Sequence, residues 1–263
     1  MSAGDKTTPP KSAPGNSTDY WSTTRQPLNC LLFLTPLLIV YEAGILFLGT
    51  NTGNPEAYRN GADHWMRSAL QHLGGTHALL LPALIVIGLI GWHLVGRYRW
   101  RASPEMIIGM LVESLLYASC LVLLGELQDL AFRQLHTLQA GYTMNVMSSD
   151  MIPQFISYIG AGVYEETLFR LCLLPICYGL WRLALLPHKP AVVAAILFTS
   201  VLFSTAHYIG PGADQFTTFS FLFRAIAGAF FAILFVLRGF GITAGCHAAY
   251  DILVGILLAT QTG

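Results

Sequence analysis

Seven ionisable side chains in the second half of the chain lie inside stretches that are otherwise apolar enough for a membrane. They are Glu165, Glu166, Arg170, His207, Arg224, His247 and Asp251. If these side chains were left unpaired in lipid, they would together cost on the order of 10–20 kcal/mol. We therefore expect them to face one another or a wet cavity, where they could do chemistry.

The spacing of these residues predicts which of them share a helix face. Glu166 and Arg170 are four residues apart and can form an ion pair, whereas Glu165 points about 100° away from Glu166. His247 and Asp251 are also four residues apart, so the acid can orient the imidazole or share its ligand. Carboxylates beside imidazoles can activate water for hydrolysis or relay protons, and the pattern fits both functions. For the first pair alone, a buried structural ion pair is an equally good interpretation.

The composition indicates the helices that must position these residues. Only 11% of the 263 residues are charged, whereas soluble chains carry about 25%. A formal net charge of zero gives no electrostatic case for a nucleic-acid partner. Stretches of about 20 apolar residues can cross a bilayer core of about 30 Å as helices. Such stretches, some of them short, are 28–48, 78–95, 106–124, 155–180, 191–207, 218–237 and 242–260. We expect an all-α bundle of about seven transmembrane helices, with six to eight as the range.

The remaining segments are polar or amphipathic. Residues 1–27 are rich in Ser, Thr and Pro, which predicts a disordered tail before a single transmembrane domain over 28–263. Residues 61–73 and 127–138 mix apolar and charged side chains and are expected to lie in the membrane interface as short amphipathic helices. The five cysteines form no CxxC pair, so we expect no disulfide framework.

The basic residues predict an orientation in the membrane. If the N-terminus is cytoplasmic, nine Lys and Arg residues fall in inside segments and three in outside segments, as the positive-inside rule requires. We expect a multi-pass protein of the plasma (inner) membrane with its C-terminus outside. In this topology the spans that carry His207 and His247 run parallel, and ideal straight helices would separate the two histidines by about 15 Å.

Three short motifs resemble one known family. Residues Tyr164 to Arg170 (YEETLFR) fit the EExxxR signature of the CPBP intramembrane protease family. Phe203 to His207 (FSTAH) fit its FxxxH signature, and His247 to Asp251 (HAAYD) fit its HxxxN or HxxxD signature. This family contains the type II CAAX prenyl endoproteases and the bacteriocin-processing and self-immunity proteins. The resemblance implies a protease-like core at about 155–260.

The resemblance also implies roles for the motif residues. Glu165 resembles the glutamate that activates water, with Glu166 and Arg170 as the pair that fixes its helix. His207 resembles the histidine that holds the water. The remaining two, His247 and Asp251, resemble the groups that stabilise the oxyanion, although better-characterised members carry Asn at the last position and an ionised Asp only accepts hydrogen bonds. The implied activity is cleavage of a membrane-anchored protein or peptide without a cofactor.

Several alternatives are compatible with the same residues. His207, His247 and Asp251 could bind zinc with an open position for water. A non-enzymatic immunity or partner-binding protein could retain the fold, and a proton-coupled transporter could use the same acids and histidines, although no inverted repeat is visible. We expect Arg224 to pair with a carboxylate, with recognition of a substrate backbone or C-terminal carboxylate as the alternative. Glu42 and Glu113 are interpreted as helix-packing acids.

Overall fold

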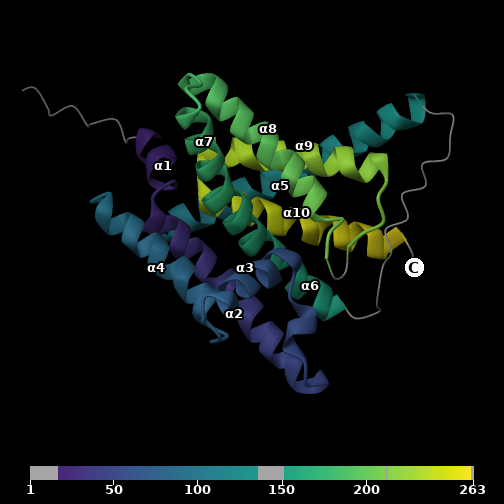
Figure 1. The fold of residues 1–263 in the computed structure, drawn as a ribbon, viewed down its shortest axis with the longest axis horizontal. Helices are drawn as coiled ribbons and strands as arrows, with labels where there is room; N and C mark the ends of the chain where they lie inside the picture. Colours follow the sequence, from purple (N-terminus) through teal and green to yellow (C-terminus); the bar gives the residue numbers. More distant parts are fainter. Residues whose placement is uncertain (1–16, 136–150, 211–212, 262–263) are drawn as a thin grey trace, which may run out of the picture.

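The computed structural model describes residues 17–135, 151–210 and 213–261, and within these residues every regular element is helical and no strand occurs (Figure 1). The first half contains α1 (Ser17–Thr23), α2 (Pro27–Thr52), the short 3-10 helix η1 (Pro55–Tyr58), α3 (Gly61–His72), α4 (Leu80–Val95) and α5 (Pro104–Leu135). The second half contains α6 (Met151–Gly160), the π-helical segments η2 (Ala161–Glu165) and η3 (Thr167–Leu173), α7 (Leu174–Leu183), α8 (His188–Ala206), α9 (Thr218–Arg238) and α10 (Phe240–Gln261).

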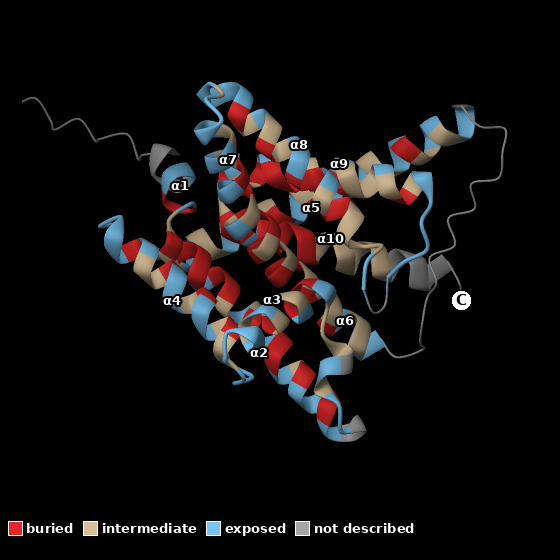
Figure 2. Ribbon diagram, viewed as in Figure 1, coloured by how far each residue is buried: buried red, intermediate tan, exposed pale blue. Residues whose placement is uncertain are grey.

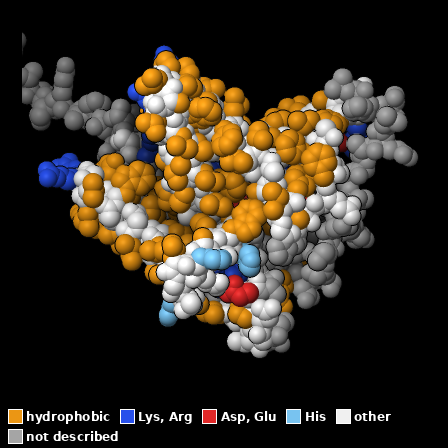
Figure 3. Space-filling view, viewed as in Figure 1, with side chains coloured by type: hydrophobic (Ala, Val, Ile, Leu, Met, Phe, Trp, Pro, Cys, Tyr) orange, Lys and Arg blue, Asp and Glu red, His pale blue; other side chains and the backbone are white. Residues whose placement is uncertain are grey.

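Among the described residues, four helices are long and apolar enough to cross a membrane. They comprise Pro27–Thr50, Pro104–Gln134, His188–Ala206 and Thr218–Arg238. Many large apolar side chains on these helices face outward. Hydrophobic side chains are spread widely over the face of the molecule seen in Figure 3. The chain is therefore an integral membrane protein. The expected total of about seven spans is not confirmed, because α4 has only 16 residues and the stretch 155–180 is divided among α6, two π-helical segments and α7.

Two segments differ from their sequence prediction. Residues 127–135 continue α5 instead of forming a separate interfacial helix, and residues 136–138 lie outside the described part of the chain. The helix continues because no Gly or Pro interrupts it there, and the Gln128 side chain fastens it to α9 by donating to the Phe219 carbonyl at 3.0 Å. The other predicted interfacial segment, 61–73, does form a helix, α3, but its residues Asp63 and Arg67 are buried.

The predicted N-terminal tail is helical in its last part. Residues 1–16 lie outside the described part of the chain, but Ser17–Thr23 forms α1. Arg238 holds the α1 helix against the bundle. Its guanidinium lies 3.9 Å from the Trp21 ring centroid and donates to the Trp21 carbonyl. The same guanidinium pairs with Glu113 of α5. Tyr20 also donates to Glu113 at 3.0 Å. Glu113 thus joins α5 to α9 and to α1, which is the packing role predicted for it. Membrane orientation and membrane type stay predictions.

The main hydrophobic core is built around α2 and α10, with buried side chains from α3, α4, α5, α6, η2 and α9 packed against them. Figure 2 shows buried residues along both α2 and α10. Close helix contacts use glycine: a side-chain Cβ on Gly228 of α9 would lie 3.0 Å from the Ser200 Cα atom of α8. Such close packing lets polar groups on neighbouring helices reach one another.

Candidate active site

The EExxxR motif lies where the helix from α6 to α7 becomes π-helical. The i→i+5 bonding of η2 and η3 is rare and is frequent at functional sites. Gly162 within η2 packs directly on α10, since a Cβ there would lie 2.6 Å from the backbone nitrogen of Ala248. The absence of a side chain at Gly162 thus brings the two motif-bearing segments together.

Glu165 lies between the two motif histidines. Its Oε2 atom is 3.7 Å from the Nε2 atom of His207 and 4.0 Å from the Nε2 atom of His247. This oxygen is buried and has no direct hydrogen-bond partner among the described residues. The Nδ1 atom of His207 lies 2.8 Å from the Phe203 carbonyl, and Nδ1 of His247 lies 2.7 Å from Glu166 Oε1. Because both Nδ1 atoms donate to these acceptors, both Nε2 atoms face Glu165.

Glu166 lies on a different face of the same segment and is fully buried. It accepts from His247 and pairs with Arg170, whose Nε lies 3.1 Å from Glu166 Oε2. Arg170 also donates to the Gly228 carbonyl at 3.1 Å and lies over the Phe203 ring at 4.5 Å. These contacts tie the motif segment to α8, α9 and α10. A guanidinium that compensates a buried carboxylate in this way is expected to be costly to remove.

Aromatic rings fix the orientation of the second histidine. Phe231 of α9 stacks on His247 with ring centroids 4.5 Å apart, and Phe203 lies edge-on to it at 5.9 Å. The Oδ2 atom of Asp251 lies 3.6 Å from His247 Nε2, one helical turn along α10. The carboxylates of Glu165 and Asp251 therefore both face this nitrogen.

His207 and His247 do not have the separation of about 15 Å that ideal straight spans would impose. Each Nε2 atom lies within 4.0 Å of the same Glu165 oxygen. Phe203, one turn before His207, packs against the His247 ring, so the end of α8 contacts the first half of α10. The two helices are thus offset along their lengths, whereas the prediction assumed straight helices in register.

Arg224 of α9 lies outside the three motifs. Its guanidinium pairs with Asp214 and lies over the Tyr208 ring at 5.3 Å. The predicted pairing with a carboxylate is thus made with an acid on the segment between α8 and α9.

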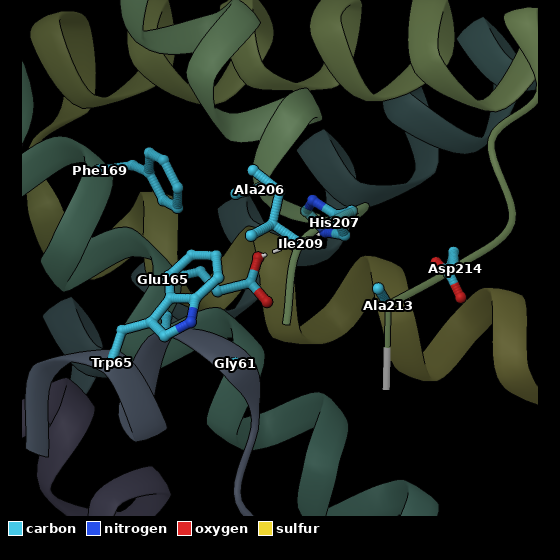
Figure 4. Close-up of a pocket in the computed structure, with 10 residues that line it drawn as sticks. Gly61, Trp65, Glu165, Phe169, Ala206, His207, Ile209, Ala213 and Asp214 are labelled. Carbon is cyan, nitrogen blue, oxygen red and sulfur yellow. Dashed lines mark ion pairs between the residues drawn. The ribbon is translucent and has the colours of Figure 1, made fainter. Parts of the chain in front are cut away.

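A cavity of about 130 Å³ opens beside Glu165. Its lining residues are Gly61, Ala62, Trp65, Glu165, Phe169, Ala206, His207, Ile209, Ala213 and Asp214. Figure 4 shows the Glu165 carboxylate between the Trp65 indole and the His207 ring. Sequence reasoning missed the contribution of α3 to this cavity. The signal was present as the amphipathic pattern of residues 61–73, but we interpreted it as a helix lying on the membrane surface.

A comparison with protein families finds a match for the part of the chain that carries the motifs. Residues 147–253 match the family model described as type II CAAX prenyl endopeptidase Rce1-like. This part of the chain is therefore similar to Rce1-like proteins. The match spans all three motifs and confirms the resemblance to the CPBP proteases. No curated protein and no solved structure matches the chain at a significant level. The matched region contains Glu165 and both histidines, whereas α3, which lines the same cavity, lies outside it.

Proposed function

We propose that this protein is an intramembrane endopeptidase that cleaves a membrane-anchored protein or peptide with water activated by Glu165. One observation carries the proposal: a buried carboxylate oxygen lies 3.7 and 4.0 Å from two imidazole Nε2 atoms, beside a cavity. These distances exceed a direct hydrogen bond, and in this proposal a water molecule bridges the three groups. The match to a family of CAAX-type intramembrane proteases supports the same reaction class.

The proposed reaction needs no covalent intermediate. Glu165 takes a proton from the water as the water oxygen attacks the scissile carbonyl carbon. The proton then passes from Glu165 to the leaving amine as the C–N bond breaks, which restores the carboxylate. His207 holds the water through Nε2, and its Nδ1 contact with the Phe203 carbonyl fixes the ring.

In this mechanism His247 stabilises the oxyanion by donating a hydrogen bond to it. Because its Nδ1 proton is directed at Glu166, a donor at Nε2 requires the doubly protonated ring. The carboxylates of Glu166 and Asp251 would offset the positive charge of that ring. Asp251 then orients and neutralises His247 instead of donating to the oxyanion, which accounts for Asp where related proteases carry Asn.

Zinc catalysis is the alternative within the protease class. Both histidines donate through Nδ1 to an oxygen acceptor, as zinc-bound histidines usually do. In the described part of the chain, however, no group of three or more His, Cys, Asp or Glu side chains converges with the geometry of a metal site. We therefore assign no step to a metal, and a chelation experiment separates the two mechanisms.

The test uses the purified full chain in liposomes with two probe substrates, a farnesylated peptide ending in a CAAX sequence and an unprenylated transmembrane peptide. We expect cleavage of at least one probe at a single bond, mapped by mass spectrometry, and unchanged rates after exhaustive chelation. Loss of cleavage that zinc restores would favour the metal mechanism. Failure to cleave either probe would favour a partner-binding protein, and a proton flux across the liposome membrane would favour a transporter.

A further inference from the structure

A second buried polar cluster lies beside the candidate active site and joins the N-terminal helices to the motif segment. We call it the ionic network; its members are Tyr41, Glu42, Arg59, Asp63, Arg67 and Tyr164. It contains two buried carboxylates and two guanidiniums, and Arg59 also pairs with the exposed Glu56 at 3.1 Å. The sequence prediction had interpreted Glu42 only as a helix-packing acid.

Each carboxylate of the ionic network is satisfied by several donors. Glu42 accepts from Arg67 at 2.8 Å, from Arg59 at 3.4 Å, and from the Tyr164 hydroxyl. Asp63 accepts from Arg67 at 2.6 Å, from Arg59 at 2.8 Å and from the Tyr41 hydroxyl at 2.9 Å. A buried polar network with this degree of satisfaction is rigid and specifies one arrangement of the helices that it joins. Here it joins α2, the η1–α3 segment and η2.

Tyr164 is the one member of the ionic network that belongs to the motif segment. It is fully buried, and it directly precedes Glu165. Its hydroxyl donates to Glu42, while the next side chain points into the cavity toward the two histidines. A rotation of η2 about its axis that moved the Glu165 carboxylate would therefore pull Tyr164 away from Glu42.

The hydrogen bond from Tyr164 to Glu42 helps to hold the π-helical segment η2. Isolated π-helical turns are rare, so surrounding contacts must hold η2 in its conformation. On one side Gly162 packs on α10, and on the other the Tyr164 ring packs on Tyr41 at 5.1 Å between centroids. The ionic network also holds α3, whose residues Ala62 and Trp65 line the same cavity as Glu165.

We infer that Tyr164, through its hydrogen bond to Glu42, is a positioning residue for Glu165. It sets where the Glu165 carboxylate lies along and around the axis of η2, relative to His207 and His247. This inference rests on the proposed function for its activity readout, but its geometric content does not. The ionic network lies outside the matched region except for Tyr164. The N-terminal helices would therefore act on the reaction by holding the motif segment in place.

The test compares Tyr164→Phe with Tyr41→Phe, which are matched because each removes one buried hydroxyl from the same network and keeps the ring. They differ because the Tyr164 hydroxyl bonds the motif segment to Glu42, whereas the Tyr41 hydroxyl bonds α2 to Asp63 of α3. On whichever probe peptide is cleaved, we expect Tyr164→Phe to lower kcat by about 10-fold or more with little change in KM, since a misplacement of about 1 Å can cost about 100-fold. Tyr41→Phe should keep kcat even if it lowers thermal stability as much.

A second readout needs no substrate. In protein labelled with 13C at histidine Cε1, the NMR signals of His207 and His247 report the position of the Glu165 carboxylate. We expect Tyr164→Phe to move both signals in the direction seen for Glu165→Gln, and Tyr41→Phe to leave them in place. If Tyr164→Phe does not fold, Glu42→Gln weakens the same bond and should produce a smaller shift in the same direction.

Three outcomes would overturn the inference. The first is that the histidine signals do not move in Tyr164→Phe, or in Glu42→Gln where that variant replaces it. The second is that Tyr164→Phe and Tyr41→Phe change kcat and the histidine signals equally. The third is that kcat falls only in proportion to the folded fraction. If neither probe is cleaved, the proposed function fails while the NMR comparison still decides the positioning role.

Discussion

Gly162 offers a direct test of how the candidate site is assembled. In Gly162→Ala, the new Cβ would lie 2.6 Å from the Ala248 nitrogen and 2.7 Å from the Ala244 carbonyl oxygen. Ordinary contact between such atoms requires about 3.5 Å, so the motif segment must retreat from α10 by nearly 1 Å. These are backbone atoms, and no flexible side chain can relieve the clash.

The expected consequences are a modest loss of stability and a large loss of rate. Overpacking of this kind costs about 1–3 kcal/mol. The same displacement moves Glu165 away from His247, and a shift of about 1 Å can lower the rate about 100-fold. We expect kcat on the cleaved probe peptide to fall by this order with little change in KM, while the protein stays folded by thermal unfolding in detergent.

Gly179→Ala on α7 is the matched control. A Cβ at Gly179 has no neighbour within 4 Å, and alanine favours a helix over glycine by up to about 1 kcal/mol. This variant should keep full activity and equal or greater stability. The reasoning is refuted if Gly162→Ala keeps wild-type kcat, or if both variants lose the same fraction of activity.

Three further outcomes follow from the structure. Trp65→Ala should widen the cavity and raise kcat/KM for probes with a bulky residue beside the scissile bond relative to small ones, by about 10-fold; unchanged selectivity would show that the indole does not contact substrate. Arg170→Gln leaves Glu166 without its guanidinium and should lower stability by about 3–5 kcal/mol in detergent unfolding, whereas a double change with Glu166→Gln should recover part of this loss. Burial and the hydrogen bond to Glu113 raise the pKa of Tyr20 to about 12 from 10. The resulting stability is present below pH 10 and is lost as pH rises from 10 to 12, and Tyr20→Phe should abolish this dependence.

Local patterns in the sequence predicted the helices well because hydrophobic runs and helix breakers are local properties. The stretches 191–207 and 218–237 correspond closely to α8 and α9. The i,i+4 spacing predicted the ion pair of Glu166 with Arg170, which the structure contains. The tertiary arrangement was harder to predict from the sequence. It depends on contacts between distant segments, such as Phe203 of α8 with His247 of α10 and Gly162 of η2 with Ala248 of α10.

The polar partners between distant segments could not be predicted from spacing. Glu42 and Tyr164 are 122 positions apart, and only the folded chain brings the carboxylate to the hydroxyl. The π-helical turns of η2 and η3 also leave no mark in a hydrophobic pattern, because they arise from how the segment packs between α3 and α10. The role of Trp65 in the cavity wall was missed for another reason: the amphipathic pattern of residues 61–73 also fits a helix on the membrane surface.

The central claim is that Glu165, and not its neighbour Glu166, is the base. The most direct measurement is the cleavage rate of Glu165→Gln on a probe peptide that the wild-type protein cleaves, in protein shown to be folded. Loss of a general base lowers the rate by about 100- to 10,000-fold, and we predict a loss in this range with KM little changed. Cleavage by Glu165→Gln at the wild-type rate would contradict the account.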